Sequence, residues 1–358
     1  MKKGIALILT AMLLVLSGCG QTPAQGGGDT LSVVCTIFPQ YDWVRQILGG
    51  RADTMELTLL TDRGVDLHSY QPTVADMGKI SECELFINVG GESDAWVPDA
   101  LAEAENPGMV AINLLEAVGN AAKAEELVEG MEDDEHAHEE GEPHEEEGEH
   151  TEEHEDEEHE DEEHEGEEHE GEEHSHEGEV VLDEHVWLSL RNAEALCAVI
   201  ANALSELDED NAAIYAENLE AYNLKLRAAD ENYRAAADTA AVKTLLFGDR
   251  FPFRYLVDDY NIEYFAAFPG CSAETEASFE TIAFLTDKTD ELNLKCLMVT
   301  ESSDKSIAET IIRNSAAQNQ QILVLDAMQS VTAADIDGGA TYLSIMESNL
   351  NILKEALK

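Results

Sequence analysis

Short apolar runs alternate with helical segments along most of the chain, and this pattern predicts the fold class. Four runs that read as buried strands lie at 31–38, 55–60, 85–89 and 110–114, separated by helical spacing at 41–48, 73–81 and 96–104. A second set of runs follows at 243–247, 262–266, 296–300 and 322–325. Continuous apolar runs separated by helices are typical of parallel sheets that helices cover. We therefore expect an α/β protein with two lobes, each built on a four-stranded parallel sheet.

A long helical stretch lies between the two sets of strands. Residues 211–237 contain no Gly or Pro, and apolar residues recur there at near-helical spacing: Ile214, Leu219, Tyr222, Leu226, Ala229 and Tyr233. At 1.5 Å per residue such a helix is roughly 40 Å long, enough to join both lobes rigidly. A coiled-coil helix is the weaker interpretation, because polar residues interrupt the stripe. The expected domains are an N-terminal lobe at 30–208, a linking helix at 209–239 and a C-terminal lobe at 240–358.

The first residues have the pattern of a secretory signal followed by a lipid-attachment site. Two lysines precede an apolar core over 5–16, which is too short to be a comfortable membrane span. Leu16-Ser17-Gly18-Cys19 resembles a bacterial lipobox, in which the cysteine carries the lipid. We expect a signal peptide over 1–18 and a flexible tether over 19–29, anchored through Cys19 to the outer face of the cytoplasmic membrane. A cleaved signal with an incidental cysteine is the alternative.

A low-complexity segment of acidic residues and histidines interrupts the first lobe. Residues 131–179 hold 29 of the 77 acidic residues and ten of the 12 histidines, without any Lys or Arg. The segment has almost nothing to bury, so we expect it to be disordered. Histidines repeated among carboxylates favour weak metal capture over a simple solubility linker. The net charge of −57 excludes nucleic acid as a natural partner, since phosphate contacts need a basic face.

The cysteines indicate neither a disulfide framework nor a structural zinc finger. Besides Cys19 there are five, an odd number, and none form a CxxC pair. A bridge between Cys271 and Cys296 is the one pairing left open for an oxidising compartment.

Only two histidines lie outside the low-complexity segment, and both occupy loops. His68 follows the second expected strand, and ligands of open α/β sheets bind at the carboxyl ends of strands. His185 lies just ahead of a helix that Ser189 is expected to cap. Asp326 directly follows the last expected strand. Imidazole is the commonest protein ligand for borderline metals, so these loops predict a metal site in a cleft rather than buried structural histidines.

The order of these features resembles one family of metal-binding proteins. The lipobox, Phe38-Pro39-Gln40-Tyr41-Asp42-Trp43, residues 64–72, residues 183–190 and Leu325-Asp326-Ala327-Met328 are similar to segments of zinc-uptake ABC transporter substrate-binding lipoproteins (ZnuA/AdcA-like, metal-binding cluster A-I family). The resemblance covers nearly all of 31–358. It implies a periplasmic-binding-protein-like fold of the metal-binding class, in which one long rigid helix joins two α/β lobes and one metal binds between them.

The resemblance also implies a ligand set. His68 and His185 match the family's first two metal-binding histidines, and Asp326 matches its acidic position after the last strand. The family usually supplies a further His or Glu just after the first strand of the second lobe, where this chain reads Phe247-Gly248-Asp249-Arg250. Asp249 is the nearest residue able to ligate, and on this hypothesis Asp249→Ala weakens the tight site about tenfold or more.

Two other donors remain open for that position. One is water, and the other is a histidine of the acidic segment, such as His174 or His176, which lie about ten residues before His185. In that case deletion of the segment, rather than loss of Asp249, weakens the tight site.

The implied function is capture of Zn²⁺ and its delivery to an ABC permease by a monomer. The His-rich segment favours Zn²⁺, with Mn²⁺ or Fe²⁺ as the alternative, because carboxylate ligands favour Mn²⁺. A surface metal buffer or adhesin without a transporter is a further alternative. Two histidines with carboxylates around zinc could activate water. However, the chain has no HExxH motif, serine nucleophile elbow or Gly-rich phosphate loop, so we do not expect an enzyme.

Overall fold

The computed structural model describes residues 31–132, 181–272 and 276–358. The expected signal peptide, Cys19 and its tether lie outside the described residues. So does the low-complexity segment of residues 131–179, called the His-rich segment below, apart from Met131 and Glu132.

The N-terminal lobe is built on one parallel sheet with helices on both faces. Its strands are β1 (Ser32–Cys35), β2 (Glu56–Leu59), β3 (Leu85–Asn88) and β4 (Val110–Asn113), in the order β2-β1-β3-β4. Side chains alternate between the faces, as the pleat requires. Val34 and Phe86 pack under α3 (Val74–Glu82) and α4 (Val97–Ala102), whereas Val33 and Ile87 join the core under α2 (Phe38–Leu48). The four-stranded sheet predicted for this lobe is therefore confirmed.

The C-terminal lobe repeats the same strand order. Its sheet runs β6-β5-β7-β8, all parallel, with β5 (Thr244–Phe251), β6 (Glu263–Pro269), β7 (Cys296–Thr300) and β8 (Gln321–Leu325). The remaining helices of the lobe are α8 (Arg254–Tyr260), α9 (Phe279–Glu291), α10 (Ser306–Asn314), α11 (Ala333–Asp337) and α12 (Tyr342–Ala356). Topologically, β6 corresponds to β2 and β5 to β1, so loops after corresponding strands can be compared directly.

One strand is longer than the sequence predicts. We expected the first strand of the C-terminal lobe to end at Phe247, with Asp249 in a loop, but β5 continues to Phe251. Arg250 pairs with Phe268 and Phe251 with Pro269 of β6, after an irregularity between Phe247 and Arg250. The apolar residue Phe251 has a partner in the neighbouring strand, and this pairing extends β5 beyond the polar residues that were expected to end it.

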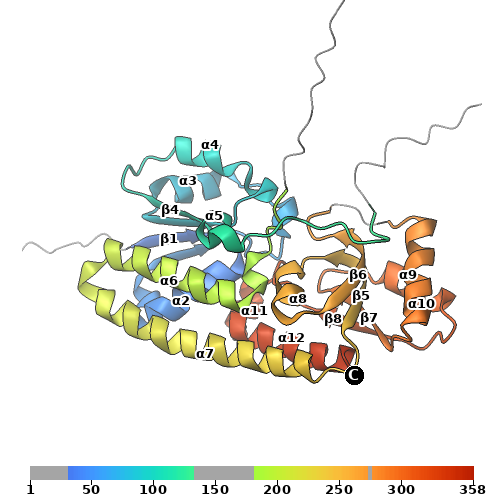
Figure 1. Cartoon of the computed structure of the whole chain (residues 1–358). Helices are drawn as coiled ribbons and strands as arrows, with labels where there is room; N and C mark the ends of the chain where they lie inside the picture. The colour runs from blue at the N-terminus through green and yellow to red at the C-terminus, as the bar shows by residue number, and fades with distance from the viewer. Residues whose placement is uncertain (1–30, 133–180, 273–275) are drawn as a thin grey trace, which may run out of the picture.

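Two helices between the sheets connect the lobes. In α6 (Leu190–Leu207) the predicted cap is confirmed, since the Ser189 hydroxyl accepts from the Asn192 amide. The following α7 (Ala212–Asp238) runs along both lobes in Figure 1, with α12 beside it. It is tied to each lobe, because Asn218 donates to the Ile47 carbonyl and the Tyr233 hydroxyl donates to the Met346 carbonyl. A single apolar core extends through these contacts into both lobes.

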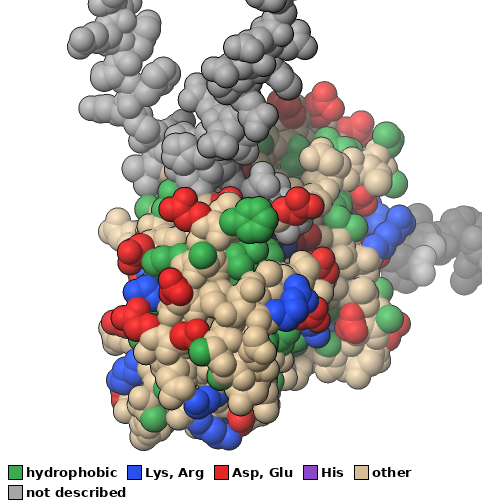
Figure 2. All heavy atoms as spheres, turned by 90° about the vertical axis from the view of Figure 1, so that its right-hand side faces the viewer, with side chains coloured by type: hydrophobic (Ala, Val, Ile, Leu, Met, Phe, Trp, Pro, Cys, Tyr) green, Lys and Arg blue, Asp and Glu red, His purple; other side chains and the backbone are tan. Residues whose placement is uncertain are grey.

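Two expectations from the sequence concern the charge of the surface and a disulfide bridge. On the face in Figure 2, acidic and basic side chains are interspersed among the described residues, without a large basic patch. Cys271 and Cys296 are both free thiols, so the bridge left open between them does not form. Among the described residues, no helix combines the length and apolar character needed to cross a membrane.

Candidate metal centre

The loop after β2 presents His68 at the boundary between the lobes. Asp66 caps a short 3-10 helix (Leu67–Ser69, η2), and its carboxylate accepts from the His68 backbone amide at 3.0 Å. Leu67 is buried in the apolar core, and its packing there holds the turn in place. The imidazole Nδ1 lies 2.7 Å from the Ser93 hydroxyl, so the ring is held at one nitrogen while Nε2 faces the cleft.

Asp183 holds both the backbone and the ring of His185. Asp183 Oδ1 accepts from the His185 backbone amide at 2.9 Å and lies 3.0 Å from its Nδ1. The ring is fully buried beside Trp187, whose indole donates to the Ala327 carbonyl of the C-terminal lobe at 2.9 Å. The motif therefore fixes the ring and connects the two lobes at the same point.

The two histidines meet through their Nε2 atoms, which are 3.2 Å apart. The Nδ1 atoms point the other way, toward consecutive acidic residues: His185 faces Asp183, and His68 lies 3.6 Å from Glu184 Oε2. That Glu184 oxygen is buried and has no hydrogen-bond partner, while Oε1 accepts from the Ser93 amide. Metal-binding histidines commonly have this arrangement, in which a carboxylate orients the ring from its far nitrogen.

The amide of Gln329 lies against both rings. Its Nε2 is 3.0 Å from each histidine Nε2, so its two N–H groups can donate one bond to each ring. Gln329 reaches this place because its own backbone amide donates to Glu301 Oε1 and because Met328 adopts a left-handed conformation, with φ of 63°. Two ring nitrogens thus converge on one point, which a neutral amide occupies.

Cys271 completes the group. Its Sγ and one nitrogen from each of His68 and His185 lie within 4.8 Å of one another, and no other trio of potential ligands of this kind occurs in the described part of the chain. Cys271 follows β6, where Gly270 allows a close approach: a Cβ on Gly270 would lie 3.1 Å from His185 Cε1. The Cys271 amide donates to Glu125 Oε1 at 3.2 Å.

Asp249 is not brought into this group. Its Oδ1 accepts from the Arg250 amide, and its Oδ2 accepts from both the amide and the hydroxyl of Thr300 at 2.9 and 2.6 Å. Both oxygens are therefore bound within the C-terminal sheet, where they bridge β5 and β7 at the irregularity in β5. The carboxylate compensates there for backbone pairing that the irregularity disrupts.

Asp326 does not join the group either. Its Oδ1 accepts from the Met328 amide at 2.7 Å, while its backbone pairs with the Asn349 side chain. Burial raises the pKa of Asp326, and burial followed by the charge of Asp326 raises the pKa of Glu301. The loop after β8 reaches the histidines as expected, but Gln329 is the side chain that it presents to them.

The surroundings of the rings are acidic and poorly solvated. Burial, and next the proximity of His185, lower the pKa of His68 to about 3, so the ring is neutral at ordinary pH. Burial raises the pKa of Glu184 and of Glu125. Burial also acts to raise the pKa of Asp66, but Arg250 at 2.7 Å and His68 together outweigh it and the net shift is downward. A cation placed between the rings would offset this concentration of carboxyl groups.

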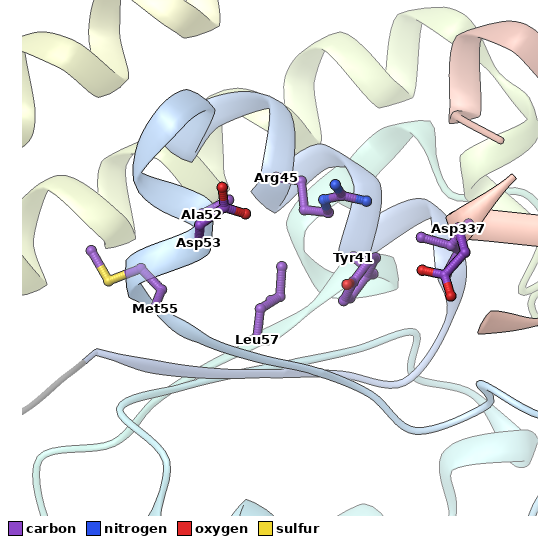
Figure 3. Close-up of a pocket in the computed structure, with 8 residues that line it drawn as sticks. Tyr41, Arg45, Ala52, Asp53, Met55, Leu57 and Asp337 are labelled. Atoms are coloured by element: carbon purple, nitrogen blue, oxygen red, sulfur yellow. The ribbon is translucent and has the colours of Figure 1, made fainter. Parts of the chain in front are cut away.

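A cleft reaches the His68 side of the centre. It has a volume of about 410 Å³, and both lobes line it, with His68 from one and Arg250 and Phe268 from the other. A second hollow of about 360 Å³, shown in Figure 3, lies between α2 and α11. Its lining includes Tyr41 and Arg45 but no histidine or cysteine, so it lacks the ligands that a borderline metal prefers.

Comparison with known proteins identifies the family. The family described as zinc-uptake complex component A, periplasmic (ZnuA), matches residues 33–356. The chain belongs to this family. It is 29% identical to the high-affinity zinc uptake system protein ZnuA of Bacillus subtilis, over 98% of this chain and 96% of that protein. It is 27% identical to the zinc-binding lipoprotein AdcA of Streptococcus pneumoniae, over 99% of this chain but 61% of AdcA. Membership of the family that the sequence resembles is therefore confirmed.

Solved structures give the same fold. The Zn(II)-bound ZnuA-like domain of Streptococcus pneumoniae AdcA is 24% identical, with a TM-score of 0.63, over 92% of this chain and 99% of that one. The lipoprotein YcdH of Bacillus subtilis is 23% identical, with a TM-score of 0.65, over the same 92% and 99%. The two-lobed architecture, with its long connecting helix, is thus the fold of this family.

Sequence reasoning located two of the centre's residues and missed two others. His68 and His185 stand out because they are the only histidines in the folded part of the chain. Cys271 and Gln329 were missed, although each follows a strand of the C-terminal sheet. The position after β6 was the available signal for Cys271, since the equivalent loop after β2 carries His68.

Proposed function

We propose that the protein captures Zn²⁺ outside the cytoplasm and delivers it to an ABC permease. The observation that carries this proposal is the convergence of two imidazoles, His68 and His185, whose Nε2 atoms lie 3.2 Å apart where the two lobes meet. The printed descriptions of the related proteins name zinc uptake or zinc binding. The donor types fit that metal, because imidazole nitrogen binds borderline cations such as Zn²⁺.

Metal entry requires the Gln329 amide to move aside. A zinc ion bound at about 2.0–2.1 Å from each Nε2 takes up the two lone pairs that now accept from Gln329. The rings need little reorientation, because Asp183 and Glu184 already face their Nδ1 atoms. Metal capture therefore replaces two neutral hydrogen bonds with two metal bonds. Because Gln329 is displaced, metal binding is linked to the position of the loop after β8.

Three further features belong to the proposal. Cys19 anchors the chain to the outer face of the cytoplasmic membrane through lipid, and the protein acts as a monomer. The His-rich segment collects weakly bound metal and raises its local concentration, because its ten histidines are repeated among carboxylates. The bound metal is cargo for transport rather than a catalyst, so we propose no enzymatic activity.

Metal analysis of protein purified without added metal tests the proposal. We expect one tightly held Zn²⁺ per molecule, with weaker ions on the His-rich segment. Chelator competition with His68→Ala/His185→Ala is expected to show loss of the tight site, whereas the matched control His136→Ala/His138→Ala keeps it. Tight binding that survives loss of His68 and His185 contradicts the assignment, and preferential retention of Mn²⁺ contradicts the choice of metal.

A further inference from the structure

The thiol of Cys271 is part of the centre but has no place in the family ligand set that the sequence implies. We propose that Cys271 is the third protein ligand of the bound metal, so that the site is formed by two imidazoles and one thiolate. This inference rests on the proposed function, because the two histidines define where the metal lies.

The distances allow this coordination without rearrangement of the fold. Sγ and the two ring nitrogens lie within 4.8 Å of one another. With zinc bonds of about 2.3 Å to sulfur and 2.0–2.1 Å to nitrogen, tetrahedral ligand atoms are roughly 3.5 Å apart. The two Nε2 atoms are already 3.2 Å apart, so the adjustment falls on Sγ, which has to approach the nitrogens by about an ångström, within the reach of a side-chain rotation.

A glycine before Cys271 allows the loop that carries the cysteine to approach the His185 ring closely. Any side chain at Gly270 would meet the Phe251 carbonyl at 2.9 Å and the His185 ring at 3.1 Å. Glycine removes that obstacle, and the Cys271 amide is then fixed by Glu125. Arg250 reaches the next residue, with Nη1 3.5 Å from the Ser272 carbonyl, while its Nη2 pairs with Asp66 across the cleft. One guanidinium thus links the His68 loop to the Cys271 loop.

Topology gives an independent reason to assign a ligand here. β6 and β2 occupy the same position in sheets of the same strand order. His68 lies in the loop after β2, and Cys271 lies in the loop after β6. The carboxylates expected from the C-terminal lobe are engaged elsewhere, Asp249 with Thr300 and Asp326 with Met328. Among the described residues of that lobe, Cys271 is the one that joins both histidines as a potential ligand.

Coordination by Cys271 has a defined chemical balance and a consequence for selectivity. The S–H bond is replaced by a sulfur–metal bond, the proton leaves to solvent, and no atom changes oxidation state. A thiolate with two imidazoles favours Zn²⁺ and disfavours Mn²⁺, which prefers oxygen ligands. The substitution of sulfur for a carboxylate thus makes the cleft more selective than the sequence-based ligand set predicts.

Cobalt substitution tests the proposal, because thiolate bound to Co²⁺ gives a charge-transfer absorption in the near ultraviolet that imidazole and carboxylate do not. We would titrate the metal-free full chain with less than one equivalent of Co²⁺. The absorption is expected in the unaltered protein and in the control Cys296→Ser, which removes another partly exposed thiol. Cys271→Ser is expected to lose the absorption and at least tenfold in Zn²⁺ affinity, whereas Cys271→His is expected to recover the affinity but not the absorption.

A second measurement needs no variant. Saturating Zn²⁺ is expected to protect Cys271 from alkylation in the unaltered protein, with the modified site located by mass spectrometry. Tight cobalt binding without the charge-transfer absorption, or equal alkylation with and without Zn²⁺, overturns Cys271 as a ligand and leaves the proposed function standing. Failure to bind cobalt tightly at all overturns the proposed function, and this inference with it.

Discussion

The two lobes share a strand order but contribute different chemistry to the cleft. The N-terminal lobe, with the sheet β2-β1-β3-β4, supplies both histidines, and each has a carboxylate near its Nδ1. The C-terminal sheet, β6-β5-β7-β8, contributes a thiol and an amide instead. The same strand order therefore supports two imidazoles oriented by carboxylates in the N-terminal lobe, and a thiol and an amide in the C-terminal lobe. The difference teaches that strand order determines where donors can appear, whereas local hydrogen bonds determine which side chain reaches the metal.

The largest effect within this comparison is expected on the histidine side. Asp183→Asn keeps the size of the side chain but removes the charge that orients His185 through Nδ1. Loss of such a partner usually costs about 10–100-fold in metal affinity. Chelator competition checks this, with Asp230→Asn as a control in which the carboxylate removed pairs with Arg191 and Arg234. An unchanged affinity in Asp183→Asn would mean that the carboxylate does not orient the ring.

On the C-terminal side, Asp249 distinguishes the sequence-based ligand set from the arrangement described above. Asp249→Ala removes three hydrogen bonds within the sheet, including both bonds to Thr300. We expect the free energy of unfolding of metal-free protein to fall by about 1–3 kcal/mol, and Zn²⁺ affinity to change less than about threefold, or 0.7 kcal/mol. Denaturant unfolding and chelator competition measure the two quantities. A tenfold loss of affinity in a stably folded variant would restore Asp249 as a ligand.

The pH dependence of stability tests whether His68 is buried in its neutral form. Its pKa is about 3 in the fold, against about 6.5 in an unfolded chain. The unfolded state therefore binds the extra proton first, and stability falls as pH drops below about 6.5, by at most about 1.4 kcal/mol per unit. We expect metal-free protein to lose more stability between about pH 6.5 and 4.5 than His68→Gln does. Identical slopes in the two proteins would show that His68 is not buried in its neutral form.

The smallest expected effect concerns Gln329, which competes with the metal. Gln329→Ala removes two hydrogen bonds that stabilise the metal-free centre. Because each such bond has a net value of about 1 kcal/mol, metal-free stability should fall slightly. Zn²⁺ affinity should rise by roughly fivefold, or about 1 kcal/mol. Calorimetric titration measures the change, and a weaker affinity would indicate that Gln329 assists binding rather than opposing it.

The fold could be predicted from the sequence because its strands are continuous apolar runs. The prediction that 296–300 forms a strand matches β7 residue for residue, and the Ser189 cap also follows from local chemistry. The side chains that line the cleft are harder to predict. Asp249 is directed away by an irregularity in β5, and Gln329 is positioned by the left-handed turn at Met328. Such turns depend on tertiary contacts that periodicity does not encode.

The histidines show the opposite case. Both were recognisable because they are the only histidines outside the His-rich segment and because each lies in a short motif. The structure shows that neighbours within each motif hold the residue, since Asp66 caps the turn at His68 and Asp183 binds the backbone and ring of His185. In contrast, Cys271 lies outside any such motif, and its position near His185 depends on Gly270, which has no side chain to meet the His185 ring. Side chains fixed by their own neighbours can be assigned from sequence, whereas those fixed by the opposing lobe require the structure.

The most direct test of the account is the position of the metal in the cleft. Anomalous diffraction at the zinc edge would locate it in crystals of protein in which a short Gly-Ser linker replaces residues 133–180, so that ions on the His-rich segment do not contribute. We expect one peak about 2.0–2.1 Å from the Nε2 atoms of both His68 and His185, with Gln329 displaced. A zinc ion bound elsewhere, or one that leaves the Gln329 amide between the two rings, would contradict it.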